Sequence, residues 1–157
     1  MFQGRIVEME KALLDMAWSG SWQPFFVMLA KAFKEQTAIR DYLSAEQAIQ
    51  GFLLAWLNIS DFFQTRSERE LNKGFCDLYL EPFVARYPGM GYDYLIELKY
   101  IKRGQWSEEK QAAEIKEERA QLVRYRRDAR LKQVGDDVTW ICPILVFHGW
   151  ELVWCDT

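Results

Sequence analysis

Asp77, Glu97 and Lys99 are the residues of this chain whose types and spacing could do chemistry. Glu97 and Lys99 stand two residues apart in residues 91–102, GYDYLIELKYIK, where most other side chains are apolar or aromatic and typical of a strand. Burying a charge in such a segment is costly unless the charge is paired or bound to a metal. Because side chains alternate along a strand, Glu97 and Lys99 share one face. The pattern therefore predicts a polar site on a buried strand.

A second carboxylate lies 20 residues upstream, at Asp77 in the strand-like segment GFCDLYL. Consecutive strands usually pair, so we expect Asp77 beside Glu97, with Lys99 one step along the same face. Two adjacent carboxylates repel, which raises the pKa of one of them, and a divalent cation between them removes that cost. Mg²⁺ prefers oxygen ligands, and a neighbouring lysine can bind phosphate or orient an attacking water. The combination indicates phosphodiester hydrolysis with Mg²⁺ or Mn²⁺ as cofactor.

The elements that must position these residues follow from the hydrophobic periodicity. Three helices are predicted first, then three strands, one long helix that begins after Ser107, and two closing strands. A helix between the third and fourth strands implies a crossover, hence a mixed sheet covered by helices. The predicted helices span residues 5–18, 22–35, 45–58 and 107–133, and the predicted strands span residues 62–67, 75–81, 92–101, 138–147 and 151–154. On the second and third strands, the face opposite Asp77 and Glu97 is expected to pack the core.

GFCDLYL followed by YLIELKY resembles the Asp … Glu-x-Lys core of the PD-(D/E)XK nuclease superfamily, although Cys76 stands where the nominal motif has proline. The segment AEQAIQGFLLAWL, with Glu46, is similar to the opening helix of that superfamily, and Gln121 and Tyr125 resemble its Gln-x-x-x-Tyr pattern. The resemblance is strongest over residues 43–130. Within the superfamily, the chain looks most like the nuclease-like domain at the C-terminus of bacterial AAA-type ATPase-like proteins.

The resemblance implies an α/β, restriction-endonuclease-like fold with a mixed central sheet flanked by helices. It also implies a helical extension or linker at residues 1–40 and a nuclease-like domain at residues 41–157. Asp77 and Glu97, with the Leu98 carbonyl, would hold Mg²⁺ or Mn²⁺, and Lys99 would position water and stabilise phosphate charge. Glu46 would bind a second cation or orient a metal-bound water, and Gln121 would steady the lysine or contact phosphate. The substrate would be nucleic acid, first of all DNA, contacted by Lys102, Arg103, Arg124 and Tyr125.

Each of these features also has a plainer interpretation. Glu97 and Lys99 could form the solvent face of an antiparallel strand, and Glu46 could complement a helix dipole. The long helix is acidic in its first half, which includes Glu114 and Glu118, and basic in its second half. Helix dipoles favour that order, so a solvated face is the expected role for most of these charges.

Composition limits the function classes. A chain of 157 residues suits one domain with a real core. The net charge of -3 gives no global signal for nucleic-acid binding, which would have to come from a local patch. The three cysteines lack CxxC spacing, which argues against a zinc cluster and favours a reducing, cytoplasmic location. No apolar stretch reaches the ~18 residues that a membrane span needs.

A non-catalytic alternative remains at this stage. No GxxxxGK[ST] loop occurs, so any ATPase part must lie outside these residues, and we expect the chain to be a segment of a longer protein. The acidic charge favours an interaction or regulatory domain of a larger ATPase-like protein. The apolar N-terminal helices could dock on that protein or on a second copy in a homodimer. A third alternative, a domain with no site, requires Asp77 and Glu97 to point to opposite faces.

Overall fold

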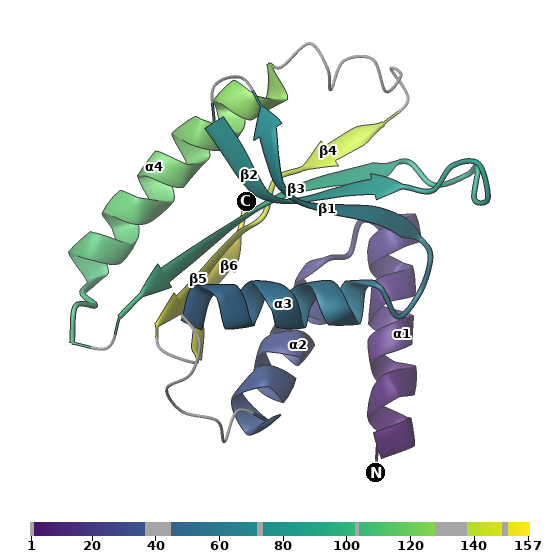
Figure 1. Cartoon of the computed structure of the whole chain (residues 1–157), viewed down its shortest axis with the longest axis horizontal. Coiled ribbons are helices and arrows are strands. Elements are labelled where there is room, and N and C mark those ends of the chain that lie inside the picture. Colours follow the sequence, from purple (N-terminus) through teal and green to yellow (C-terminus); the bar gives the residue numbers. More distant parts are fainter. Residues whose placement is uncertain (1, 37–44, 72–73, 103, 128–137, 149–150) are drawn as a thin grey trace.

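Four helices flank a mixed six-stranded sheet in the computed structural model, which describes residues 2–36, 45–71, 74–102, 104–127, 138–148 and 151–157 (Figure 1). This architecture confirms the predicted α/β, restriction-endonuclease-like fold with an N-terminal helical part. The helices are α1 (Phe2–Ser19), α2 (Gln23–Gln36), α3 (Ala45–Leu57) and α4 (Glu108–Arg126). The strands are β1 (Phe63–Leu71), β2 (Gly74–Pro82), β3 (Tyr92–Ile101), β4 (Thr139–Ile141), β5 (Ile144–His148) and β6 (Glu151–Asp156).

The central strand of the sheet is β3. It pairs antiparallel with β2, which pairs antiparallel with β1, so the first three strands form a meander. On its other side, β3 pairs parallel with β4 and β5, and β6 closes that edge antiparallel to β5. The parallel connection from β3 to β4 runs through α4, as the predicted crossover requires.

One predicted strand, residues 138–147, is two strands in the structure. Cys142 and Pro143 separate β4 from β5, because proline has no N–H to donate to a ladder. Both strands nevertheless keep one register against β3, since Tyr92 faces Thr139 and Glu97 faces Ile144. The Glu97 N–H donates to the Pro143 carbonyl at 3.0 Å. The interruption therefore lies directly beside Glu97.

The long helix α4 begins where the sequence predicts. Ser107 is its N-cap, and the Ser107 Oγ accepts a hydrogen bond from the Lys110 N–H at 3.0 Å. The helix ends at Arg126 rather than near residue 133, with Arg127 as its C-cap. Residues 128–137 lie outside the described part of the chain.

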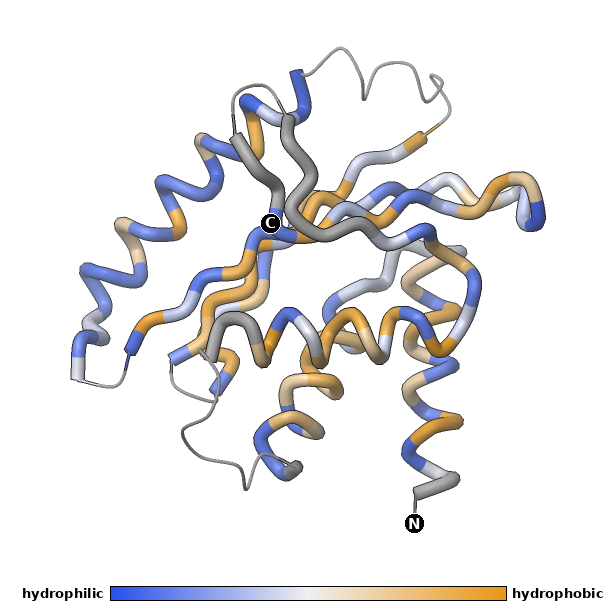
Figure 2. Tube along the Cα trace, in the orientation of Figure 1, coloured by the Kyte–Doolittle hydropathy of each residue, from blue (hydrophilic) through white to orange (hydrophobic). Residues whose placement is uncertain are grey.

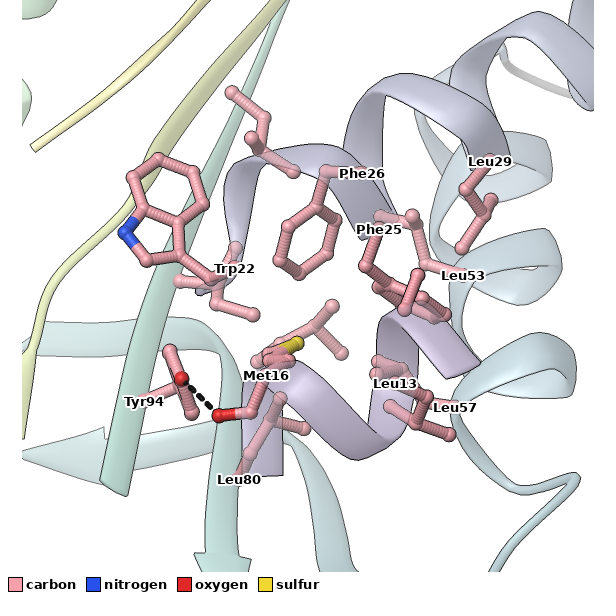
Figure 3. Packing of buried hydrophobic residues seen from close by; sticks show 14 of the residues in the cluster. Leu13, Met16, Trp22, Phe25, Phe26, Leu29, Leu53, Leu57, Leu80 and Tyr94 are labelled. Atoms are coloured by element: carbon pink, nitrogen blue, oxygen red, sulfur yellow. Dashed lines mark hydrogen bonds between the residues drawn. The ribbon is translucent and has the colours of Figure 1, made fainter. Parts of the chain in front are cut away.

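Helices cover both faces of the sheet, with α1, α2 and α3 on one side and α4 on the other (Figure 1). The first core joins α1–α3 to the sheet residues Leu78, Leu80, Tyr94 and Ile96. Figure 3 shows Leu80 and Tyr94 beside Met16 of α1. The second core joins α4 to Tyr79, Leu95, Ile144 and Val146, although α4 is mostly hydrophilic along its length (Figure 2). The sheet face that carries Glu97 is therefore covered by a helix, and so is the opposite face. The sequence interpretation did not foresee the core on the Glu97 face.

None of the described helices combines the length and the apolar content that a membrane crossing requires.

One hydrogen bond ties α1 to the central strand. The Tyr94 hydroxyl donates to the Met16 carbonyl at 2.6 Å, and both side chains are fully buried (Figure 3).

We expect Tyr94→Phe to lower the free energy of unfolding by about 1–3 kcal/mol, because the Met16 carbonyl would stay buried without its partner. Urea denaturation measures the change. Tyr100→Phe, at a half-buried position of the same strand, should cost about 0.5 kcal/mol or less. Equal losses in the two variants would contradict this assignment.

Candidate active site

The paired part of β2 and β3 ends next to Asp77 and Glu97. The last antiparallel pair is Leu78 opposite Ile96, so Asp77 and Glu97 are the residues that follow on each strand. The Asp77 carboxylate then accepts a hydrogen bond from the Leu98 N–H, with 2.8 Å between Oδ2 and the nitrogen. The Asp77 side chain thus takes the place of a backbone partner for β3 at this point. The hydrogen bond holds its carboxylate against β3.

Glu97 is almost completely buried, with 3% of its surface exposed. Burial raises the pKa of Glu97 most, the charges of Asp77 and Glu118 add to the shift, and the result is about 10. Its Oε1 atom is buried and has no hydrogen-bond partner among the described residues. Without a cation, therefore, Glu97 carries a proton at neutral pH, and one of its oxygens has a lone-pair site open for a ligand.

The Lys99 ammonium contacts two carboxylates of α4. Its Nζ lies 2.8 Å from Glu118 Oε1 and 3.3 Å from Glu114 Oε2. Burial lowers the pKa of Lys99, but the hydrogen bond and charge of Glu118, with those of Glu114, outweigh burial and raise the pKa overall. The ammonium stays charged, and one third of the side chain remains exposed.

Glu118 is one of the site residues that the sequence interpretation missed. Placing it on a solvated helix face was wrong, because only 4% of its surface is exposed and its carboxyl contacts both Glu97 and Lys99. The signal was available in the spacing. The buried residues of α4 form one stripe at helical intervals, and Glu118 belongs to it together with Ile115, Leu122 and Tyr125.

Gln50 on α3 is a second missed residue. Its Nε2 donates to the backbone carbonyl of Asp77 at 3.1 Å, which anchors α3 to β2 at the site. Gln50 follows Glu46 by one helical turn, so the two share a helix face, and this spacing could have indicated the contact. The side chain of Glu46 itself lies outside the described residues.

Gln121 and Tyr125 lie one and two turns beyond Glu118 on α4. The Gln121 side-chain amide donates to the Tyr125 hydroxyl. Tyr125 is 1% exposed and packs in the second core, so its ring faces the sheet rather than the surface where a nucleic acid could contact it. Arg124 and Lys102 are exposed, and Arg103 lies outside the described residues.

Another buried acid on the same sheet face, Asp93, has a different environment. Its Oδ2 accepts a hydrogen bond from the Tyr79 hydroxyl at 2.9 Å, and the Tyr79 ring stacks on Trp140. A neutral donor from the neighbouring strand therefore serves one of the two Asp93 oxygens, Oδ2. Glu97, in contrast, is surrounded by carboxyl groups, which is the arrangement that favours a cation.

The donor set fits a hard divalent cation. Asp77 and Glu97 offer adjacent carboxylates, one with an open buried oxygen. Among the described residues, no three side chains of the types His, Cys, Asp and Glu are arranged to hold a metal. Mg²⁺ does not need three such side chains, because it commonly uses one or two carboxylates and keeps several waters. The N–H and C=O of one strand residue point the same way, so the Leu98 carbonyl is directed to the side of Asp77.

A helix-covered mixed sheet with two carboxylates and a lysine at one point of its central strands is the arrangement of a restriction-endonuclease-like protein. The sequence model of the PD-(D/E)XK nuclease superfamily matches residues 44–157, most of the chain. The chain belongs to the PD-(D/E)XK nuclease superfamily, which confirms that part of the resemblance. No curated protein and no solved structure matches it.

The buried Glu97 carboxyl should make the metal-free protein less stable as the pH rises. The folded state keeps a proton up to a pKa of about 10, whereas the unfolded state releases it near the ordinary value of 4.5. Between these values we expect the free energy of unfolding to fall by about 1.4 kcal/mol per pH unit at most. Glu97→Gln, which cannot ionise, should remove this slope.

Urea denaturation across this pH range in the presence of a chelator measures the slope. Glu117→Gln, at an exposed position of α4, is the matched control and should keep the slope of the unsubstituted protein. An identical slope in Glu97→Gln would show that Glu97 is ionised in the folded state.

Proposed function

We propose that residues 41–157 form a nuclease domain that hydrolyses phosphodiester bonds of nucleic acid, DNA first of all, with Mg²⁺ or Mn²⁺. The observation that carries the proposal is the pair of adjacent carboxyls of Asp77 and Glu97 at the end of the β2–β3 ladder, with Glu118 contacting both Glu97 and Lys99. Membership of the PD-(D/E)XK nuclease superfamily supports it, because members generally use divalent metals.

Asp77, Glu97 and the Leu98 carbonyl would hold the cation. When bound, the cation would acidify a water molecule and polarise a phosphoryl oxygen. Glu97 would lose its proton when the cation binds. The positive charge of the cation would then offset the repulsion between Glu97 and the carboxyls of Asp77 and Glu118. Glu46, one turn before Gln50, is the proposed residue for a second cation or for orienting a bound water.

Lys99 would orient the attacking water and stabilise negative charge on the phosphate. Its raised pKa keeps it cationic, and its partial exposure leaves it accessible to substrate. Gln121 would help to orient the site from α4. Lys102 and Arg124, both exposed, and Arg103 would contact backbone phosphates.

The rival function is a non-catalytic interaction or regulatory domain of a larger ATPase-like protein. Two observations favour it, namely the net charge of -3 and the ion pairing of Lys99 with two glutamates. The helical extension, residues 1–40, would connect or dock the ATPase part, or pair two copies of the chain. Val7, Leu14 and Trp18 of α1 support such docking, since they are 62%, 43% and 42% exposed. A cytoplasmic location would fit either function.

Cleavage of labelled single- and double-stranded DNA with Mg²⁺ or Mn²⁺ tests the enzyme directly. We expect Glu97→Ala to abolish cleavage and Lys99→Ala to lower kcat by about 10²-fold, because each removes a group that acts on the reacting phosphate. Lys102→Ala, at an exposed phosphate-contact position, should mainly raise KM. Equal cleavage by the unsubstituted protein and Glu97→Ala would rule out this site as the source of activity.

Calorimetry with Mn²⁺ separates the enzyme from the rival. Binding should release about one proton, visible as a heat that depends on the buffer, and the affinity should increase with pH as Glu97 ionises more easily. Asp77→Ala should abolish binding, whereas Asp61→Ala, a surface carboxylate paired with Arg86, should leave it unchanged. No binding by the unsubstituted protein would support the non-catalytic domain.

A further inference from the structure

We propose that Glu118 of α4 is the positioning residue that holds the Lys99 ammonium beside Glu97 for the reaction. This role rests on the proposed nuclease function of the same site. The resemblance implies that Gln121, three residues further along the helix, steadies the lysine or contacts phosphate. The ion pairs of Lys99 point instead to Glu118, with Glu114 as a second contact.

A lysine in this position needs an anchor. Its ammonium ends a flexible four-carbon stem, so the β3 backbone alone does not fix where the charge lies. The Lys99 side chain is 33% exposed, whereas the Glu118 side chain is 5% exposed and only 2.8 Å away. The buried carboxylate is therefore the fixed member of the pair, and Lys99 is the member that it positions.

The packing of α4 explains why Glu118 is fixed. Ile115 and Leu122, one turn to either side, are buried in the second core, and Ser107 caps the start of the helix. The Glu118 carboxyl also interacts with that of Glu97. One carboxyl group thus contacts both the proposed metal ligand and the proposed catalytic lysine, which sets the distance between them.

Glu114 makes a weaker contact with the same ammonium. Its Oε2 lies 3.3 Å from Lys99 Nζ, and its side chain is 23% exposed. An ammonium has three N–H donors. Glu118 and Glu114 are the two acceptors that the described residues offer it, so a third N–H can donate to a water or a phosphate oxygen when substrate binds.

A purely structural ion pair, which only docks α4 on the sheet, makes a different prediction. In that case loss of Glu118 would lower stability but would not change the lysine's catalytic geometry once the protein is folded. A positioning role requires a loss of kcat at unchanged KM, because misplacement of a reacting group by about 1 Å can cost about 10²-fold in rate.

The test compares Glu118→Ala, Glu118→Gln and Glu117→Gln in DNA cleavage with Mn²⁺, after urea denaturation has shown that each variant is folded. We expect Glu118→Ala to lower kcat by about 10²-fold with KM unchanged. Glu118→Gln should recover part of the loss, since its amide oxygen still accepts from the ammonium. Glu117→Gln, at an exposed position of the same helix, should stay close to the unsubstituted protein.

A second readout does not depend on activity. Acetylation of Lys99 by an amine-reactive reagent, followed by mass spectrometry, reports how firmly the ammonium is held. We expect faster acetylation of Lys99 in Glu118→Ala and an unchanged rate at exposed Lys116, the internal control.

Unchanged kcat together with unchanged Lys99 acetylation in Glu118→Ala overturns the positioning role and leaves the nuclease function standing. Absence of metal-dependent cleavage by the unsubstituted protein overturns the nuclease function, and the positioning role with it. If Glu118→Ala does not fold, Glu118→Gln decides the question. Its expected result is a smaller loss of kcat at unchanged KM, and full kcat overturns the proposal.

Discussion

The burial of the Glu97 carboxyl is the constraint on which the rest of the structure depends. A carboxylate with 3% exposure needs a proton or a cation, and its nearest neighbours, Asp77 and Glu118, are themselves acids. Such an arrangement does not serve stability, because an apolar side chain would pack at this position without the repulsion. A buried acid at position 97 of a core strand is understandable if a divalent cation binds there.

The fold builds this environment from the two neighbouring strands and from helices on both faces of the sheet. The β2–β3 ladder ends at Asp77, whose side chain takes over the Leu98 N–H, and on the other side Pro143 interrupts the parallel strand opposite Glu97. From above the sheet, α4 brings Glu118 and Glu114 to Lys99. Below it, α3 is fastened to Asp77 by Gln50. The site is therefore the point at which regular pairing stops and side chains substitute for backbone partners.

Much of this could be predicted from the sequence. Alternation within residues 75–81 and 92–101 placed Asp77, Glu97 and Lys99 on one face, and in the structure Asp77 is adjacent to Glu97 while Glu118 contacts both Glu97 and Lys99. The break at Pro143 was not predicted, because the apolar run continues across it and keeps one register with β3. Glu118 was missed because an acidic first half of a helix is ordinary dipole complementation, so its place in the buried stripe was not tested. Contacts between α4 and the sheet depend on how the crossover packs, which local periodicity does not specify.

The most direct test of the central claim is a crystal structure of the protein soaked with Mn²⁺, with the ion located by its anomalous scattering. The account predicts one strong peak between the Asp77 and Glu97 carboxylates, with the buried Oε1 of Glu97 among its ligands. A fully soaked crystal with no peak at this position, and with Glu97 still in contact with Asp77 and Glu118, would contradict it.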